Sequence, residues 1–240
     1  MKKIYIPTID STNKYVKNHY HNMESFTMIY SFNQTEGCGR WNRQWENGNQ
    51  ENIACSILIK PTPVFNQVSL LSLFTAMVVV YLLRDWNIDA SVKWPNDIFI
   101  DNKKVAGILI ETIHEKKLEA IIIGIGININ AKVFHFVDNA KATSVFLSEN
   151  KTFSLQEGID KICYWMEKMY PLFEKDPKFF LEEYQQLHIL SGKKIKLDNK
   201  NYLVSKVMMD GSLLLVGEKE NRIINNGEIT FQDEYDCFIK

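Results

Sequence analysis

The segment from residue 34 to residue 45 holds the side chains that are best suited to binding or catalysis. Its two glycines, Gly37 and Gly39, are separated by one residue, a spacing that lets backbone N–H groups converge on an anion. Arg40 and Arg43 follow directly, and guanidinium groups pair with phosphate or carboxylate through two parallel hydrogen bonds. The segment predicts an anion-binding loop, although a solvated loop with incidental charges would have a similar composition.

Two tryptophans favour the binding interpretation. Trp41 and Trp45 lie on this polar segment, where an exposed indole ring needs a reason such as stacking on a ligand or walling a pocket. The polar stretch around them runs from residue 33 to residue 52, which is long for a connection without apolar periodicity. Loops of this kind are commonly lids or binding loops.

Polar residues at two other places could complete such a site. Residues 10–13 read Asp-Ser-Thr-Asn, and these short side chains can cap a helix and also hydrogen-bond the polar head of a ligand. Residues 93–97 read Lys-Trp-Pro-Asn-Asp and end an expected strand. They form either an ordinary turn or a rim at which Lys93, Asn96 and Asp97 serve phosphate or Mg²⁺.

Two expected strands contain further candidate residues: one begins with a lysine, and the other contains two closely spaced glycines. Lys104 begins an apolar strand, and strand alternation predicts that it shares a face with Ala106. It could project into a pocket or stay in solvent. Residues 124–129 suggest a dinucleotide fingerprint, but Ile129 stands at the third glycine position. A buried strand whose glycines allow a close approach is the better interpretation.

Apolar runs and turn signals predict the elements that position these residues. Strands are expected at residues 3–6, 27–32, 53–60, 91–94, 98–100, 104–113 and 118–127, and helices at about 11–20, 67–86, 154–175 and 177–190. The last four strands form an antiparallel meander, since only short turns join them. After Gly192, short strands at 194–197, 202–208, 213–217 and 229–231 predict a small β-barrel.

Composition excludes several classes of protein. The 240 residues are 45% hydrophobic and 24% charged with a net charge of −1, which indicates a globular chain and argues against a general nucleic-acid coat. The four cysteines and five histidines show neither a disulfide framework nor a metal-cage spacing. The apolar stretch 70–83 is shorter than a membrane span and no secretory signal is visible, so we expect a core helix and a cytoplasmic protein.

Together these segments resemble the biotin protein ligases. The matching segments occur in the same order along the chain. They are residues 10–13, Gln34 with the loop that runs from Gly37 to Trp45 (here called the Gly-Arg loop), 93–97, 104–111, 124–128 and 227–229. The resemblance implies an α+β fold, with a mixed or antiparallel sheet and flanking helices like those of class II aminoacyl-tRNA synthetases. It implies a catalytic domain at residues 1–190 and a small SH3-like β-barrel at 191–240.

The resemblance also implies an activity. Such an enzyme uses ATP and Mg²⁺ to activate biotin as biotinoyl-5′-AMP, and transfers it to a lysine of a biotin carboxyl carrier protein domain. Lys104 and Arg40 would be catalytic, and Asp97 would hold Mg²⁺. The residues expected to bind biotin, ATP and the adenylate are Ser11, Thr12, Asn13, Gln34, Gly37, Cys38, Gly39, Arg40, Arg43, Trp45, Lys93, Asn96, Asp97, Lys104, Gly107, Gly126 and Asn128. No DNA or membrane partner is expected, and a homodimer is left open.

The loop departs from the family pattern G-R-G-R-x-G. Cys38 stands at the first arginine position and Asn42 at the third glycine position, where asparagine can still adopt a left-handed turn. Cys38 keeps a cysteine-dependent octanoyl transferase open as an alternative, beside a lipoate ligase of the same fold. A biotin-responsive DNA-binding repressor is a third alternative, disfavoured by the near-neutral charge and by an N-terminus too short for a winged helix-turn-helix.

Overall fold

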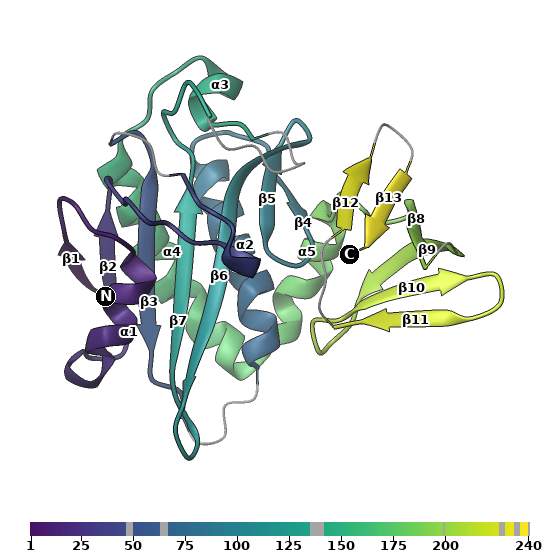
Figure 1. The fold of residues 1–240 in the computed structure, drawn as a ribbon, viewed down its shortest axis with the longest axis horizontal. Coiled ribbons are helices and arrows are strands. Elements are labelled where there is room, and N and C mark those ends of the chain that lie inside the picture. The colour runs from purple at the N-terminus through teal and green to yellow at the C-terminus, as the bar shows by residue number, and fades with distance from the viewer. Residues whose placement is uncertain are drawn as a thin grey trace.

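The computed structural model describes residues 1–46, 50–62, 67–134, 142–198, 200–225, 229–232 and 236–239. Within these residues the chain forms a seven-stranded main sheet and a six-stranded second sheet, which Figure 1 shows on its left and right sides. The main sheet has the order β1 (Lys2–Tyr5), β2 (Thr27–Ser31), β3 (Ile53–Ile59), β7 (Leu118–Ile127), β6 (Lys103–His114), β5 (Asp97–Ile100) and β4 (Ser91–Lys93). The α+β class is thereby confirmed.

The main sheet is mixed because its two halves are connected differently. Strands β4 to β7 are joined by tight turns and pair antiparallel, which confirms the expected meander. Strands β1 and β2 pair parallel, since helix α1 (Thr12–His19) connects them. Ser11 caps this helix by accepting a hydrogen bond from the Lys14 N–H, as the sequence predicts. A 3₁₀ turn, η1 (Tyr20–Asn22), ends the connection.

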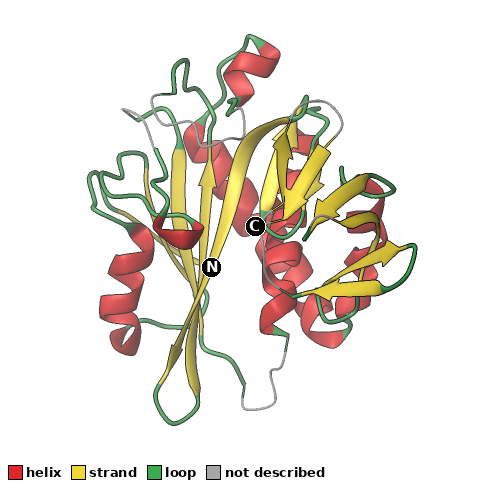
Figure 2. Cartoon of the chain, turned by 45° about the vertical axis from the view of Figure 1, so that its right-hand side comes forward, coloured by secondary structure: helices red, strands yellow, loops and turns green. Residues whose placement is uncertain are grey.

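Helices cover both faces of the main sheet. Leu58 and Ile122 pack under α1 together with Val16, whereas their neighbours Ile57 and Ile123 belong to the larger apolar cluster on the opposite face. That face is covered by α2 (Val68–Asp85) and α4 (Leu155–Lys175). Figure 2 shows these helices behind the strands.

Helix α2 is the most apolar element of the chain. It is 18 residues long with a mean hydropathy of 1.7, so by length and composition alone it could cross a membrane, unlike the shorter span expected from the sequence. Within the structure 67% of it is buried. It packs against α4 and the strands β4 to β7, and the expectation of a core helix is confirmed.

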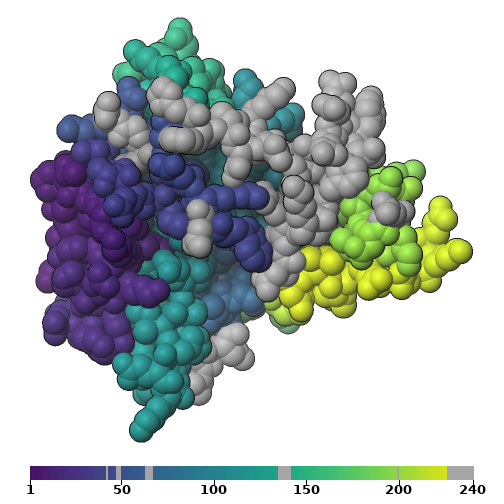
Figure 3. Space-filling view, viewed as in Figure 1, coloured from purple at the N-terminus to yellow at the C-terminus, as the bar shows by residue number. Residues whose placement is uncertain are grey.

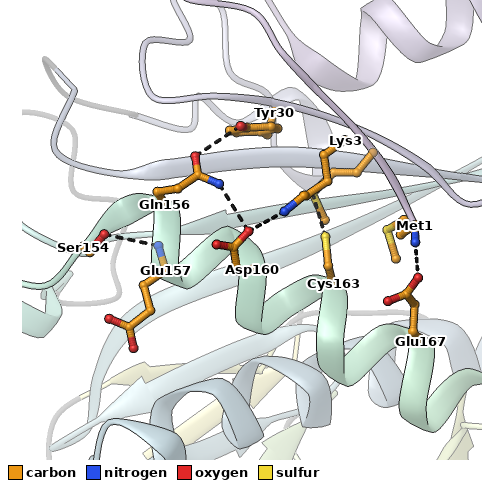
Figure 4. A network of polar contacts seen from close by, with 10 residues as sticks. Met1, Lys3, Tyr30, Ser154, Gln156, Glu157, Asp160, Cys163 and Glu167 are labelled. Carbon is orange, nitrogen blue, oxygen red and sulfur yellow. Dashed lines mark hydrogen bonds and ion pairs between the residues drawn. The ribbon is translucent and has the colours of Figure 1, made fainter.

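Polar contacts attach α4 to the strands at the β1 edge (Figure 4). Gln156 accepts a hydrogen bond from the Tyr30 hydroxyl at 3.2 Å and donates one to Asp160 at 3.3 Å. Asp160 also pairs with Lys3 of β1. Ser154 caps α4 by accepting a hydrogen bond from the Glu157 N–H, so the helix begins where the sequence predicts. These contacts attach the edge of the main sheet to α4.

The second sheet is an open arrangement among the described residues. Its order is β11 (Asn221–Ile224), β10 (Leu213–Gly217), β9 (Lys200–Val207), β8 (Lys194–Leu197), β13 (Asp236–Ile239) and β12 (Ile229–Gln232). Strands β8 and β13 pair parallel, and all other neighbours pair antiparallel. Strands β11 and β13 were not predicted from the sequence, and closure into an SH3-like barrel stays a prediction. The division at residue 190 stays one too, because one apolar cluster includes side chains from both sheets.

The helices differ from the expectation in two places. The helix expected at 177–190 is a 3₁₀ turn, η3 (Pro177–Phe180), followed by the shorter α5 (Leu181–Leu187). It stops early because His188 leaves the helix and bridges to Val92 of β4. Helix α3 (Val145–Glu149) had not been expected, although Ser144 provides a side-chain cap. The 3₁₀ turn η2 (Arg40–Asn42) lies inside the Gly-Arg loop.

Candidate active site

One cavity gathers the residues that the sequence singles out. It is lined by the start of α1, the Gly-Arg loop, the turn between β4 and β5, and strands β6 and β7. All of the expected site residues line it except Gly37, which lies beneath the backbone of Trp45. In the space-filling view the dark blue loop lies across this face, between the purple N-terminal part and the second sheet (Figure 3).

The inner end of the cavity is a hydrogen-bonded group of small polar side chains, here called the polar head and made of Thr12, Asn13, Gln34 and Ser56. Ser56 Oγ lies 2.7 Å from Thr12 Oγ1 and 2.5 Å from Asn13 Oδ1. Gln34 Oε1 accepts a hydrogen bond from the Thr12 N–H at 2.9 Å and lies 3.2 Å from Thr12 Oγ1. These groups are fixed by one another, as buried polar atoms must be.

Two glycines of β7 form the floor of the cavity. A Cβ atom added to Gly124 would lie 2.4 Å from Asn13 Oδ1, and one added to Gly126 would lie 2.4 Å from Cε2 of Trp45. Both distances are too short for any side chain, so each glycine admits one of these groups against the strand. The close approach expected for this strand is confirmed, and the approaching groups are side chains.

Lys104 faces the cavity, but it does not lie on the face of β6 that strand alternation predicts. The register of β5 against β6 shifts between Ile98, which pairs with Ala106, and Phe99, which pairs with Lys104. The extra residue is a β-bulge, and it turns Lys104 away from the face of Ala106. Lys104 Nζ instead lies 3.4 Å from the Cβ position of Gly107, so the expectation of a face shared with Ala106 was wrong.

The turn between β4 and β5 presents a carboxylate and an amide to the cavity. Asp97 Oδ1 lies 2.8 Å from Lys104 Nζ, and both side chains are largely buried. Asn96 donates from Nδ2 to the Ile108 carbonyl at 2.9 Å, which fixes the turn on β6. Its Oδ1 accepts from Arg40 Nη1 at 3.3 Å, so the turn also holds the Gly-Arg loop.

The Gly-Arg loop is more exposed than the polar head. Trp41 is 68% exposed and has a left-handed φ of 59°, whereas the sequence suggested Asn42 for this conformation. Arg40 lies over its ring at 5.7 Å. Cys38 is exposed, and its thiol donates to the Gly39 carbonyl at 3.3 Å. Among the described residues no hydrogen bond or ion pair joins Cys38 to a basic side chain.

Trp45 belongs to the same loop but is turned inward. Its ring lies on Gly126, and Lys104 Nζ is 5.6 Å from the ring centroid. Its backbone N–H donates to the Gly37 carbonyl at 2.8 Å. The indole N–H is buried, and no acceptor for it is found in the described part of the chain. Trp45 therefore walls the cavity from the loop side.

A buried layer supports the turn from below. Lys93 is 3% exposed, and its ammonium group lies 5.5 Å from the Phe99 ring. His188 is equally buried, and burial together with the nearby Lys93 charge lowers its pKa to about 3. Burial and the Asp97 charge raise the pKa of the Tyr184 hydroxyl well above its ordinary value. Trp94 donates from Nε1 to the Gly211 carbonyl at 2.9 Å, which joins the turn to the second sheet.

The charges around the cavity favour an anionic ligand. Its lining includes four basic side chains, Arg40, Arg43, Lys93 and Lys104, and two acidic ones, Glu46 and Asp97. Within the described ranges, no group of three His, Cys, Asp or Glu residues could hold a metal ion. Asn128 donates from Nδ2 to the Thr143 carbonyl at 3.0 Å and closes the end of β7.

Two residues of this site were not predicted from the sequence, Ser56 of the polar head and Glu111, which contacts it. Ser56 is fully buried in β3 and bonds both Thr12 and Asn13. Glu111 of β6 accepts from Asn13 Nδ2 at 2.7 Å. A hydroxyl inside the apolar run Ile-Ala-Cys-Ser-Ile-Leu-Ile and a carboxylate in a strand were signals that could have found them. Gly227 and Glu228, which carried part of the resemblance, lie outside the described residues.

Comparisons with known proteins agree with this geometry. A family model described as the Biotin/lipoate A/B protein ligase family matches residues 5–128. The bifunctional ligase/repressor BirA of Bacillus spizizenii is 33% identical over 172 residues, which are 70% of this chain and 53% of the relative. BirA of Salmonella typhimurium is 26% identical over 235 residues, which are 95% of this chain and 73% of that relative. The chain thus spans about half the length of the Bacillus relative.

A solved structure extends the similarity over the fold. The biotin protein ligase of Aquifex aeolicus, in complex with biotin and ATP, is 25% identical to this chain. The two superpose with a TM-score of 0.82, and the match covers 94% of this chain and 96% of that one. Because the family model covers more than half of the sequence, the chain belongs to the biotin/lipoate A/B protein ligase family.

Proposed function

We propose that this chain activates biotin with ATP to biotinoyl-5′-AMP and transfers the biotinoyl group to a lysine of a biotin carboxyl carrier protein domain. One observation carries the proposal: a single cavity combines a hydrogen-bonded polar head with a cationic end. A cyclic urea suits the first, and a carboxylate beside phosphates suits the second. The similarity to an Aquifex ligase that binds biotin and ATP supports the same assignment.

Biotin would lie along the face of β6 and β7 that carries α1. Its ureido ring would meet Ser11, Thr12, Asn13 and Gln34, which line the inner end. The thiophane ring and the valeryl chain would lie over Gly107 and the neighbouring strand residues, under the ring of Trp45. The carboxylate would then reach Lys104, whose ammonium group is 2.8 Å from Asp97 and shares the cavity with Arg40.

The first step joins two anions, so it needs positive charge at the point of attack. A carboxylate oxygen of biotin attacks the α-phosphorus of ATP, the bond to the β-phosphate oxygen breaks, and pyrophosphate leaves. Lys104, with Arg40 and Arg43, would offset the repulsion and stabilise the charge that develops on the phosphate oxygens. Asp97 holds the Lys104 ammonium group in position for this role.

In the second step the amine of the carrier lysine attacks the carbonyl carbon of the mixed anhydride. The bond from that carbon to the phosphate oxygen breaks, AMP leaves, and the new amide nitrogen loses a proton. The anhydride reacts with water, so the cavity must exclude water until the carrier arrives. Trp45 and the Gly-Arg loop would supply that cover over the floor formed by Gly124 and Gly126.

Several expectations from the sequence stay predictions. The described residues offer Mg²⁺ no cluster of ligands, and Asp97 Oδ1 already pairs with Lys104, so we derive no step through the metal. The metal would enter with the ATP phosphates, since Mg²⁺ commonly uses one carboxylate together with substrate phosphates. The homodimer and the cytoplasmic location are likewise predictions.

The two alternative enzymes of this family are less well supported. A lipoate ligase would bind an apolar dithiolane ring, which offers the polar head of the cavity no hydrogen bond of its own. An octanoyl transferase would need Cys38 as an activated thiolate, and among the described residues its thiol bonds only the Gly39 carbonyl. Both alternatives therefore fit the cavity less well than biotin.

The proposal is tested by incubating the chain with a biotin carboxyl carrier domain, ATP and Mg²⁺, together with biotin, lipoate or an octanoyl donor. Intact-mass measurement of the carrier identifies the product. We expect a mass increase equal to biotin less one water, only when both biotin and ATP are present. A carrier modified by lipoate or octanoate, and not by biotin, would contradict the proposal.

A further inference from the structure

Glu111 lies just outside the cavity, on the same face of β6 as residues that line it. Gly107 and Leu109 line the cavity, and strand alternation places Glu111 next on that face. Its Oε2 accepts a hydrogen bond from Asn13 Nδ2 at 2.7 Å, and its Oε1 is 3.7 Å from the Lys17 ammonium group. An ionised carboxylate can only accept hydrogen bonds, so the amide of Asn13 must turn its NH₂ group toward Glu111.

The orientation of Asn13 determines where the protons of the polar head lie. With its NH₂ group on Glu111, Asn13 presents Oδ1 to Ser56 at 2.5 Å, and only the Ser56 hydroxyl can donate in that contact. The single proton of the Ser56 hydroxyl is therefore used in the hydrogen bond to Asn13. The 2.7 Å contact between Ser56 and Thr12 must then use the proton of Thr12, whose other contact, to Gln34 Oε1, is longer at 3.2 Å.

The result is a one-way chain of hydrogen bonds from Thr12 through Ser56 and Asn13 to Glu111. Each of these contacts uses a proton of the preceding residue in the chain, so Thr12 Oγ1 can only accept a hydrogen bond from a ligand. Gln34 Oε1 accepts the Thr12 N–H at 2.9 Å, so the NH₂ group of Gln34 remains a donor. Thr12 Oγ1 therefore suits a ligand whose head carries an N–H donor, and the Gln34 NH₂ group suits a carbonyl on the same head, as in a cyclic urea.

We propose that Glu111 is a positioning residue that sets the specificity of the cavity for an acid with an N–H-donating cyclic urea head. It acts through Asn13 and does not touch the ligand. This inference rests on the proposed function and deepens it. A dithiolane or alkyl head has no N–H group and would leave Thr12 Oγ1 without a donor, which is the stronger form of discrimination between ligands.

The experiment measures equilibrium binding of biotin, desthiobiotin and lipoate to the intact chain and to Glu111→Leu. Desthiobiotin keeps the ureido N–H groups and lacks the sulfur ring. We expect Glu111→Leu to weaken biotin and desthiobiotin by the same factor, about tenfold, the scale of one oriented hydrogen bond. Lipoate binding should not change, so the ratio of biotin to lipoate affinity falls.

Three further variants separate positioning from damage to the fold. Glu111→Gln keeps an accepting oxygen for Asn13 and should bind biotin within about twofold of the original chain. Lys17→Ala removes only the outer ion pair at 3.7 Å and should have no effect on binding. In an Asn13→Ala background, Glu111→Leu should cost nothing more, because the residue through which it acts is gone.

Unchanged biotin affinity in Glu111→Leu would overturn the inference, and so would an equal loss for biotin, lipoate and ATP. Independent losses for Glu111→Leu and Asn13→Ala, multiplying in the double variant, would also overturn it. An original chain that binds lipoate and not biotin would contradict the proposed function together with this inference. If the original chain binds biotin and Glu111→Leu binds it equally well, only the role of Glu111 is wrong.

Discussion

The two ends of the cavity are built in different ways. At the inner end, Thr12, Asn13 and Ser56 are buried on α1 and β3 and hydrogen-bond one another. At the outer end, Arg40 and Trp41 lie on a loop, and the Trp41 ring is 68% exposed. A hydrogen bond from Arg40 to Asn96 at 3.3 Å attaches that loop to the turn beyond β4.

This difference follows from where water can reach. Buried polar atoms must satisfy one another, so the polar head has its hydrogen bonds in place before a ligand arrives. Exposed cations keep their hydration and gain most when a multiply charged phosphate approaches. The inner end therefore suits recognition of a neutral head group, and the outer end suits closure over a charged intermediate.

The largest expected effect is at the outer end. Lys104→Ala should slow biotin-dependent pyrophosphate release by more than about a hundredfold, because on the order of 3 kcal/mol of charge stabilisation is lost. Biotin binding should weaken by a smaller factor, since the polar head is untouched and only the contact to the carboxylate is lost. The exposed neighbour Lys103→Ala is the matched control, and release at the original rate by Lys104→Ala would contradict the assignment.

The two floor glycines separate the two ends most sharply. Gly124→Ala places a methyl group 2.4 Å from Asn13 Oδ1, so the polar head must rearrange. We expect the KM for biotin to rise about tenfold while the KM for ATP changes little. Gly126→Ala places its methyl group 2.4 Å from the Trp45 ring, which a loop side chain can relieve by moving outward.

Gly126→Ala should therefore affect the intermediate more than the binding of biotin. With Trp45 displaced, the adenylate loses its cover and should dissociate about tenfold faster, which labels lysines of a bystander protein. Bystander labelling by mass spectrometry, with the KM for biotin, gives the comparison. If both glycine variants change the same parameter, the distinction between the two ends is wrong.

A smaller effect is expected on stability, from the layer under the β4–β5 turn. His188 has a pKa of about 3 in the folded chain and about 6.5 when unfolded, so between these values the unfolded chain binds more protons. The contribution of the neutral His188 side chain to the free energy of unfolding is fully present well above pH 6.5 and falls as the pH decreases toward 3. From pH 6.5 to 5 the loss from this residue should be about 2 kcal/mol. Denaturant unfolding of His188→Leu should lack that part of the pH dependence.

The smallest expected effect concerns Cys38. Its thiol bonds only the adjacent Gly39 carbonyl among the described residues, so Cys38→Ala should change the KM for ATP or biotin by no more than about threefold. Carrier biotinylation kinetics measure this, with an intact-mass search for an acyl group on the enzyme. An inactive Cys38→Ala together with an acyl adduct on Cys38 in the original chain would favour the transferase.

Local patterns predicted the elements that local physics determines. Helix α2 and strand β3 follow from apolar runs, and the start of α1 follows from its Ser11 cap. The site segments could be found because their polar residues stand against such runs. The bulge that turns Lys104 could not be predicted, since it depends on how β5 pairs with β6. The same holds for the parallel pairing of β8 with β13, which joins distant segments.

The role of Glu111 shows the same limit within the site. Its spacing from Lys104 was visible in the sequence, but its contact with Asn13 spans 98 residues and exists only after α1 packs on the sheet. Ser56 was hidden inside an apolar strand in the same way. Residues that act through another side chain leave a weaker pattern than those that bind a ligand directly.

The central claim is that one cavity recognises biotin at its inner end and activates it at its outer end. Pyrophosphate release from ATP, measured without any carrier protein, tests this most directly, because the first step needs no acceptor. We predict that release depends on biotin, stops after about one turnover while the adenylate stays bound, and is not supported by lipoate or octanoate. Release that lipoate supports and biotin does not would contradict the account.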